Sequence, residues 1–253
     1  LYGDDETNRE NIVVNYDFVL DADWLEGGVV RFYDQSTETA QLTDEYRTSR
    51  GKNYRYDRDF FYEQDIHIAL WQRDPSADID KSVNALLAIN TFSQLQFSSP
   101  VQDVAKKLAL HMPHFEHREA LLDDITLLTD MFACLFDQDI IGLRLRVIDS
   151  PMCPRFHVDQ VPSRLITTYA GPATEWVPNE FADRSKLGAG NNGLSDDESG
   201  LLQQPCHIQS MQTGDVALLK GGRWQGNEDK GLIHRSPNHG DGQKRLLLTL
   251  DFA

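Results

Sequence analysis

Cysteine is scarce in this chain: Cys134, Cys153 and Cys206 are three residues in a sequence of 253. Three scattered cysteines exclude the disulfide framework that holds many small secreted domains together. The sequence also lacks an apolar run near the roughly 20 residues that a membrane helix needs, so we expect a soluble, cytoplasmic protein. It begins at Leu1 without a methionine and supports no prediction about a signal peptide.

Positive charge is in short supply as well. Lysine and arginine number 24 against 40 aspartates and glutamates, which gives a formal net charge of −16 at pH 7. Such a surface repels phosphate backbones, and no basic patch of convincing size interrupts it, so we expect no nucleic-acid partner. Hydrophobic residues still make up 40 % of the chain, enough for a substantial core. The length allows one large domain with an extension and predicts no particular oligomeric state.

The chain divides into three parts that differ in composition and in the spacing of apolar residues, and we expect them to form one compact unit. Residues 1–97 mix acidic loops with short candidate strands and are interpreted as an N-terminal extension that packs on the core. Residues 98–139 are predicted to form supporting helices, and residues 140–253 to form a strand-rich core. The candidate strands of the first part are Ile12–Leu20, Val29–Tyr33 and Ile66–Trp71.

The middle part shows helical spacing. Ser98 and Ser99 before Pro100 are typical of a helix start, because a serine side chain accepts a hydrogen bond from the first turn and proline fits there. Apolar residues at every third or fourth position then predict one helix over Val101–Met112 and a longer one over about Glu116–Phe136.

In the last part the apolar period changes to two, which predicts eight short strands. Their number and turn-rich spacing favour an α+β protein built on a double-stranded β-helix, the jelly-roll or cupin-like barrel, over a βα repeat. Residues 185–204 are rich in Gly, Asn, Ser and Asp and predict a mobile loop near the mouth of the barrel. The predicted strands are 142–148, 155–159, 164–169, 174–177, 207–211, 216–220, 232–234 and 245–252.

One constellation in this part predicts metal binding. His157 and Asp159 are two residues apart, so on a strand both side chains point to the same face. His234 ends another short apolar strand. Two imidazoles and one carboxylate form the triad that holds non-haem Fe(II) and leaves coordination positions open. The alternative is that both histidines have ordinary structural surroundings and Asp159 lies in a turn.

Arg245 strengthens the prediction, because it opens the terminal strand 245–252 eleven residues after His234. The planar fork of an arginine donates two parallel hydrogen bonds to a carboxylate. The hydroxyl of Thr249, or that of Tyr169 on a neighbouring strand, is a candidate to help hold the same anion.

Four further residues are weaker candidates for contact with a substrate. Lys220 and Arg223 flank a Gly-Gly turn that either lines the cavity mouth or is a plain β-turn. Glu175 and Trp176 are expected to form a substrate-facing wall, with core packing as the alternative for Trp176. Arg235 is expected to point away from the metal and to form a structural ion pair.

Several motifs resemble an uncharacterised, largely bacterial family, domain of unknown function 1826. The resemblance spans roughly residues 115–253, and the family name implies no activity. It rests on Cys153–Asp159, Arg164-Leu165, Thr168-Tyr169, Gly171-Pro172, Thr174–Trp176, Gly214–Gly221, His234–Pro237 and Arg245–Asp251.

The metal motif also resembles the prolyl-hydroxylase-like branch of the 2-oxoglutarate/Fe(II) oxygenases. This resemblance implies that His157, Asp159 and His234 bind iron and that Arg245 binds the far carboxylate of 2-oxoglutarate. We therefore predict a 2-oxoglutarate-dependent dioxygenase acting on a small molecule or a peptide. A zinc-dependent hydrolase is the first alternative, because the same ligands hold Zn²⁺, with Glu175 or Asp183 as its general base. A non-catalytic, cupin-like metal-handling protein is the second.

Overall fold

A computed structural model describes residues 29–33, 61–62, 64, 66–149, 153–238 and 242–253 of the chain, with residues 29–33 described by their backbone alone. The predicted strand Ile12–Leu20 lies outside the described residues. No described helix is both long enough and apolar enough to cross a membrane.

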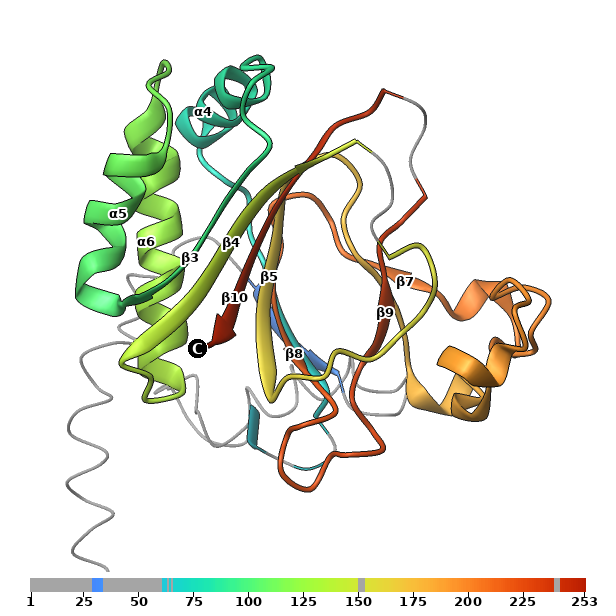
Figure 1. Ribbon diagram of the computed structural model, residues 1–253. Helices are drawn as coiled ribbons and strands as arrows, with labels where there is room; N and C mark the ends of the chain where they lie inside the picture. The colour runs from blue at the N-terminus through green and yellow to red at the C-terminus, as the bar shows by residue number, and fades with distance from the viewer. Residues whose placement is uncertain (1–28, 34–60, 63, 65, 150–152, 239–241) are drawn as a thin grey trace, which may run out of the picture.

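Two antiparallel sheets make up most of the molecule (Figure 1). The large one has the strand order β1-β2-β8-β5-β10-β4-β3, and the small one the order β7-β6-β9. The strands of the large sheet are β1 Val29–Tyr33, β2 Ile68–Gln72, β3 Gln94–Pro100, β4 Ile140–Ile148, β5 Ser163–Ala170, β8 Val216–Lys220 and β10 Arg245–Phe252, and those of the small sheet are β6 Glu175–Val177, β7 Gln209–Ser210 and β9 Ile233–Arg235.

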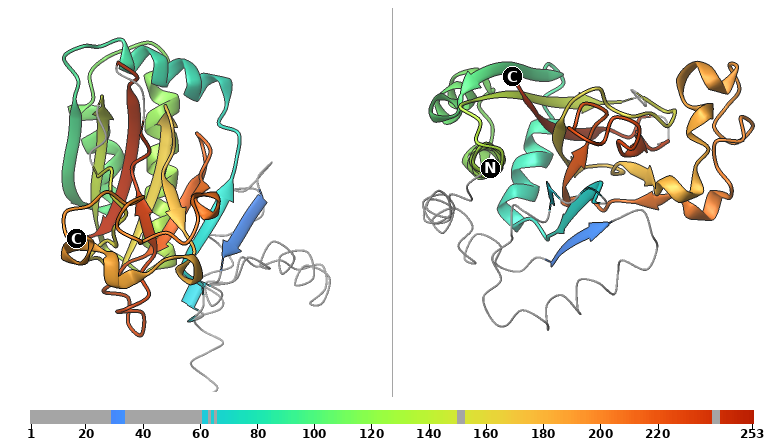
Figure 2. Two further views of the ribbon diagram at one scale, coloured as in Figure 1. Left: turned by 90° about the vertical axis from the view of Figure 1, so that its right-hand side faces the viewer. Right: turned by 90° about the horizontal axis from the view of Figure 1, so that it is seen from below.

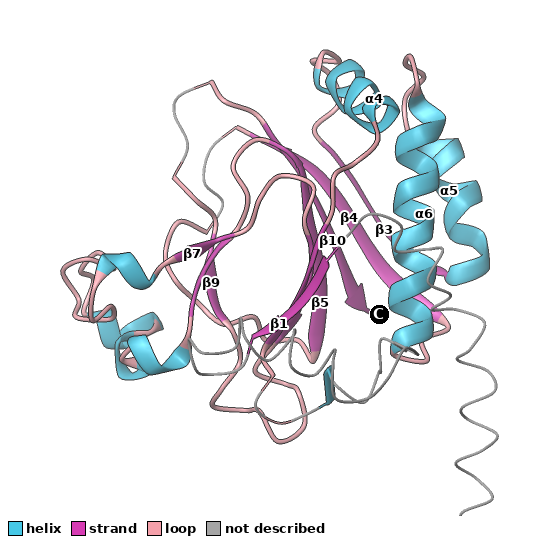
Figure 3. Ribbon diagram, turned by 180° about the vertical axis from the view of Figure 1, so that it is seen from behind, coloured by secondary structure: helices cyan, strands magenta, loops and turns pink. Residues whose placement is uncertain are grey.

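The helices α4 Ala77–Leu87, α5 Val104–His111 and α6 Arg118–Leu135 of the described chain accompany the large sheet. Figures 1 and 3 show α5 and α6 side by side at the β3–β4 end of this sheet, away from the small sheet. The predicted helices over 101–112 and 116–136 are confirmed with slightly different ends. The helix α4 was not predicted; it begins at Ser76, whose hydroxyl accepts a hydrogen bond from the backbone N–H of Ile79.

The predicted helix start at Ser98 and Ser99 is wrong. Both residues belong to the end of β3, where they pair with Gly142 and Ile141 of β4. A short 3₁₀ turn, Val101–Asp103, then leads into α5, and no side chain caps that helix. Strand pairing provides the backbone partners that the serine caps were expected to provide, so the local signal was overridden by tertiary structure.

Side-chain alternation divides the large sheet into two faces. Leu143 and Leu145 of β4, with Leu246 and Leu248 of β10, pack in the same buried cluster as the apolar face of α6. Leu247 belongs to a second cluster, together with side chains of the small sheet. The even-numbered side chains of β4 therefore face away from the helices and are available to line a cavity.

Most predicted strands of the last part are confirmed as β4, β5, β6, β8, β9 and β10, and the predicted strand 207–211 shortens to β7. The predicted strand 155–159 is wrong: this segment makes only an isolated bridge between His157 and His234. Residues 178–208 project from the small sheet (Figure 2), and this segment contains four 3₁₀ turns, 179–181, 184–186, 188–191 and 205–207.

The division into parts 1–97, 98–139 and 140–253 stays a prediction. Strands β2 and β3, which come from the first part, lie within the large sheet beside β8 and β4. The fold is thus a mixed one, with antiparallel sheets and few helices.

Candidate metal centre and its cavity

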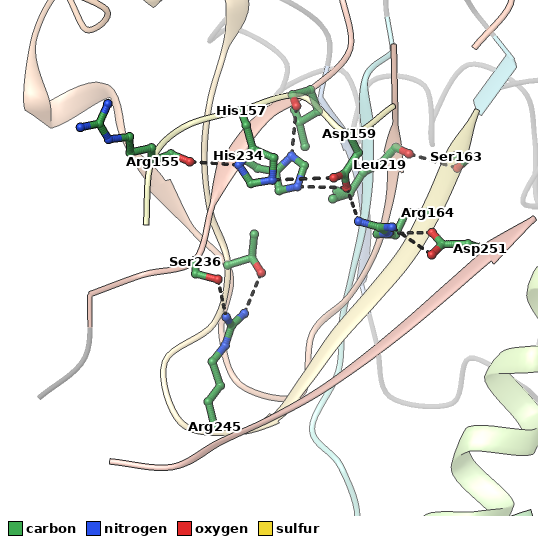
Figure 4. A network of polar contacts seen from close by, with 12 residues as sticks. Arg155, His157, Asp159, Ser163, Arg164, Leu219, His234, Ser236, Arg245 and Asp251 are labelled. Atoms are coloured by element: carbon green, nitrogen blue, oxygen red, sulfur yellow. Dashed lines mark hydrogen bonds and ion pairs between the residues drawn. The ribbon is translucent and has the colours of Figure 1, made fainter. Parts of the chain in front are cut away.

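Three side chains predicted to bind a metal converge at one point (Figure 4). Asp159 Oδ2 lies 3.2 Å from His234 Nε2, and Asp159 Oδ1 lies 3.7 Å from His157 Nε2. One ligand atom of each residue lies within 4.8 Å of the other two, a geometry found for no other group of three or more His, Cys, Asp or Glu in the described chain. This donor set suits Fe(II) and also holds Zn²⁺.

Backbone pairing brings the two histidines together. His157 and His234 exchange both N–H···O bonds, each 3.0 Å long, and their rings lie 4.6 Å apart. His234 is held in β9, and the bridge extends this order to the loop that carries His157 and Asp159. The loop therefore pairs with the edge of the small sheet at one residue, His157, although it forms no strand.

Hydrogen bonds to the backbone fix the protonation of both rings. His157 Nδ1 lies 2.9 Å from the carbonyl of Arg155, and His234 Nδ1 lies 3.1 Å from the carbonyl of Leu232. Because a carbonyl only accepts, each Nδ1 carries the hydrogen and each Nε2 offers its lone pair toward Asp159. Burial and the neighbouring ring of His234 lower the pKa of His157, which favours the neutral, metal-binding form.

Arg164, which the sequence analysis did not single out, holds the carboxylate ligand. Its Nη1 donates to Asp159 Oδ2 at 2.6 Å, while Nε and Nη2 donate to the two oxygens of Asp251 at 2.6 and 2.9 Å (Figure 4). Burial by itself would raise the pKa of Asp159, but the close approach of His234 and the charge of Arg164 outweigh it, so this pKa lies well below its usual value.

Replacing Arg164 by Gln is expected to weaken metal binding about 10- to 100-fold, the usual effect of removing a group that orients a ligand. Competition between the protein and a chelating indicator for Zn²⁺ measures it. Arg164→Lys, which keeps the charge but not the fork, is expected to lie between Gln and wild type. Equal affinities in all three proteins would show that Arg164 does not position Asp159.

A pair of glycines supports the Asp159 loop from behind. The backbone N–H of Gly222 donates to the carbonyl of Asp159 at 2.8 Å, and that of Gly221 to the carbonyl of Pro162 at 2.9 Å. A Cβ atom on Gly221 would lie 2.0 Å from the carbonyl oxygen of Val161. The Gly-Gly turn thus permits a close backbone approach that fixes a metal ligand.

This arrangement corrects the prediction for Lys220 and Arg223, neither of which lines the cavity. The ammonium of Lys220 is buried and lies 5.3 Å from the ring of Phe61 and 5.1 Å from that of Trp224. Arg223 is exposed.

Glu175 and Trp176 are likewise absent from the cavity lining. Glu175 accepts a hydrogen bond from Arg235 at 2.7 Å, and Asp196 lies 3.2 Å from the same guanidinium. The predicted structural ion pair of Arg235 is therefore confirmed, although Arg235 also lines the cavity. Trp176 is buried in the apolar cluster between the sheets, as the packing alternative predicted.

Tyr169 faces the wrong side of the sheet for a role at the metal. Its hydroxyl donates to Asp124 of α6 at 2.6 Å. The preceding residue, Thr168, points the other way and accepts a hydrogen bond from Arg245. The prediction failed because the sequence gives the strand but not which of two adjacent hydroxyls faces the cavity.

One cavity of about 180 Å³ holds both the metal-binding residues and Arg245. It lies between the two sheets and is partly open. Thr249, predicted at this site, lines it with a buried hydroxyl that no described group hydrogen-bonds. The lining consists of Arg144, Arg146, Cys153, His157, Asp159, Arg164, Ile166, Thr174, His234, Arg235, Ser236, Arg245, Leu247 and Thr249.

Arg245 is almost fully buried, with 1 % of its surface exposed. Its described partners are three hydroxyls: Ser236 at 3.2 Å (Figure 4), Thr168 at 3.2 Å and Thr174 at 2.9 Å. No carboxylate of the described residues pairs with it, and its Nε has no hydrogen-bond acceptor. Burial lowers the pKa of Arg245 to about 10, so the side chain remains a cation at neutral pH.

The model of a family described as "Protein of unknown function (DUF1826)" matches residues 59–251. The chain belongs to this family. The DUF1826 resemblance seen in the sequence is thus confirmed, and it extends further toward the N-terminus than the motifs did. No curated protein matches this DUF1826 chain.

Solved structures similar to this DUF1826 protein include three whose names refer to a dioxygenase or to 2-oxoglutarate. A rice dioxygenase for auxin oxidation has 12 % identity and a TM-score of 0.43, covering 70 % of this chain and 68 % of that one. The Arabidopsis thaliana dioxygenase for auxin oxidation 1 with 2-oxoglutarate has 8 % identity and a TM-score of 0.41, covering 95 % of this chain and 88 % of that one. Streptomyces hygroscopicus HygX with nickel and 2-oxoglutarate has 12 % identity and a TM-score of 0.39, covering 79 % of this chain and 88 % of that one. Such loose superpositions assign no chemistry to the DUF1826 site.

Proposed function

We propose that this protein is a 2-oxoglutarate-dependent oxygenase built on a double-stranded β-helix. His157, Asp159 and His234 would hold Fe(II), and Arg245 would bind the far carboxylate of 2-oxoglutarate. The observation that carries the proposal is the position of Arg245: a buried cation whose described partners are all hydroxyls, in the same cavity as His157, Asp159 and His234.

A buried guanidinium without a carboxylate is costly, because burial removes hydration that three neutral hydroxyls replace only in part. A ligand carboxylate would compensate for that cost and form charge-assisted hydrogen bonds. Ser236 lies two residues beyond His234, so its bond to Arg245 ties the cation to the strand that carries a metal ligand. A dicarboxylate that reaches from the metal to Arg245 fits this arrangement.

When bound, Fe(II) and 2-oxoglutarate supply the oxidation of a substrate C–H bond by O₂, with release of succinate and CO₂. The protein's own residues do the rest. The two backbone-bound imidazoles present Nε2 atoms, Arg164 holds Asp159 in its ionised form, and Thr249 offers a hydroxyl toward the bound acid. Ile166 and Leu247 provide apolar surface in the same cavity.

The two alternatives find less support. A zinc hydrolase needs a general base beside the metal, but Asp159 is the only carboxylate among the described lining residues. Glu175 is paired with Arg235, and Asp183 accepts hydrogen bonds from Ser185 on the surface. A metal-handling protein needs no buried cation at Arg245.

Anaerobic titration of the Fe(II)-loaded protein with 2-oxoglutarate tests the proposal. We expect a visible metal-to-ligand charge-transfer band in the wild type and none in His234→Ala. His111→Ala, which removes an exposed histidine at the end of α5, is the matched control and keeps the band. Tight Zn²⁺ binding without any band on addition of 2-oxoglutarate to the Fe(II) protein would contradict the oxygenase.

A further inference from the structure

The cavity is basic in an acidic protein. The chain has a formal net charge of −16, yet the described residues that line the cavity include five arginines and one carboxylate, that of Asp159. A cavity whose charge opposes that of the rest of the molecule concentrates anions. The five arginines are Arg144, Arg146, Arg164, Arg235 and Arg245.

Three of these arginines already have a task. Arg164 is neutralised by Asp159 and Asp251, and Arg235 by Glu175 and Asp196. Arg245 is assigned above to 2-oxoglutarate. Neither the metal centre nor its proposed cosubstrate involves the two arginines of β4.

Arg144 and Arg146 stand next to each other on the cavity face of β4. They are two residues apart on one strand, so both side chains point to the same side, while Leu143 and Leu145 point toward the helices. In the strand register Arg144 lies opposite Thr249 and Arg146 opposite Leu247. Together Arg144 and Arg146 form one wall of the cavity, called the β4 wall below.

Neither arginine of this wall lies directly opposite Arg245. Arg144 lies opposite Thr249, four residues or about 13 Å along β10 from Arg245, and Arg146 lies opposite Leu247, two residues or about 7 Å from it. Leu247 and Ile166, which lies across β10 from Arg144, form an apolar floor beside the wall. An acid held by the β4 wall would thus lay its apolar part over this floor.

The two guanidinium groups also act on each other. Burial and the charge of Arg144 lower the pKa of Arg146. The described partner of Arg144 is neutral, the side-chain oxygen of Gln96 at 3.3 Å. Two like charges in a partly buried wall repel, and an oxyanion bound between them would relieve that repulsion.

We propose that Arg144 and Arg146 bind an oxyanion of the substrate, a carboxylate or a phosphate monoester, and that the protein acts on an acidic small molecule with an apolar part. The inference rests on the proposed oxygenase function for the reaction, but the oxyanion site itself stands on the β4 wall. The size of the cavity favours a small molecule over a peptide.

Three probes of similar shape test the proposal: phenylacetate, phenyl phosphate and the neutral phenylacetamide. Calorimetric titrations use the full chain loaded with Ni(II), with and without saturating 2-oxoglutarate, and the metal-free chain. We expect phenylacetate or phenyl phosphate to bind at least about 10-fold more tightly than the amide, the effect of one or two charge-assisted hydrogen bonds. Which of the two binds identifies the oxyanion.

The preference is expected to vanish in the double variant Arg144→Gln/Arg146→Gln and to persist in Arg223→Gln, which changes an exposed arginine outside the cavity. The single variant Arg144→Gln is titrated in parallel, since it alters the less constrained part of the wall, and should lose part of the preference. Equal or undetectable binding of all three probes, or a preference that survives the double variant, would overturn the proposal.

Saturating 2-oxoglutarate separates the two sites. If it abolishes the preference for the anions, the β4 wall binds the cosubstrate and the proposal is wrong. If the charge-transfer band is missing but the metal-free protein still prefers the anions through Arg144 and Arg146, the oxyanion site stands and only the oxygenase function fails.

Discussion

Arg245→Met is expected to raise the 2-oxoglutarate concentration needed for half-saturation by about 100-fold or more, because two charge-assisted hydrogen bonds are lost. Methionine is close to the arginine stem in volume and apolar character, so it leaves the buried space filled. The affinity for Fe(II) should stay near that of the wild type, since no metal-binding residue contacts Arg245. Titration of the charge-transfer band measures the first quantity, and chelator competition the second.

A charge-conserving variant separates positioning from simple attraction. Arg245→Lys keeps the cation but loses the planar fork, so it should bind 2-oxoglutarate with an affinity between those of Met and wild type. Arg223→Met, at an exposed position outside the cavity, should match the wild type. If Arg245→Met binds 2-oxoglutarate as tightly as wild type, Arg245 does not hold the cosubstrate.

Asp124→Ala is expected to lower the free energy of unfolding by about 3–5 kcal/mol, the cost of leaving a buried charge without its partner. Asp124 of α6 accepts hydrogen bonds at 2.6 and 2.8 Å from Arg73 and at 2.6 Å from Tyr169. All three side chains lie between the helices and the large sheet, where water cannot replace the lost carboxylate. Urea unfolding of the metal-free protein measures the change without a contribution from bound metal.

Asp78→Ala is the matched control. Its carboxylate also pairs with a cation, Lys81 at 2.7 Å, but both side chains are more than half exposed. Exposed ion pairs contribute little to stability, so no measurable change is expected. Equal stability of Asp124→Ala and Asp78→Ala would mean that the buried network does not stabilise the packing of α6 on the sheet.

The convergence of His157, Asp159 and His234 could be predicted from the sequence because the pattern is local. His157 and Asp159 are two residues apart, and this spacing places both ligands on one side of an extended segment whether it forms a strand or only a bridge. Arg245 was found through its place at the start of the terminal strand, eleven residues after His234. Both predictions stay correct even where the predicted ends of a strand are wrong.

Arg164 and the β4 wall were missed for a different reason. The role of Arg164 depends on its position opposite Asp251 across β5 and β10, a pairing that only the assembled sheet defines. Arg144 and Arg146 did carry a signal, since they alternate with leucines in a predicted strand. A partly polar cavity face looks the same in sequence as a solvent-exposed face.

The fold was predicted where the apolar pattern was clear, as in the helical spacing of α6 and the apolar run of β10, and missed where strand pairing decided the outcome. Ser98 and Ser99 have the local chemistry of a helix cap but form a strand beside β4. Tyr169 and Thr168 differ by one position and face opposite sides of β5. In each case contacts with residues distant in the sequence determine the structure that forms.

The position of β10 affects how the protein is made. This strand is formed by residues 245–252, yet it lies in the sheet between β4 and β5. While the ribosome is still synthesising the segment before it, β4 and β5 each expose an unpaired edge, and such edges invite aggregation. The cavity that holds His157, Asp159, His234 and Arg245 can therefore be complete only after translation has passed residue 252, when insertion of one strand closes the sheet and supplies Arg245.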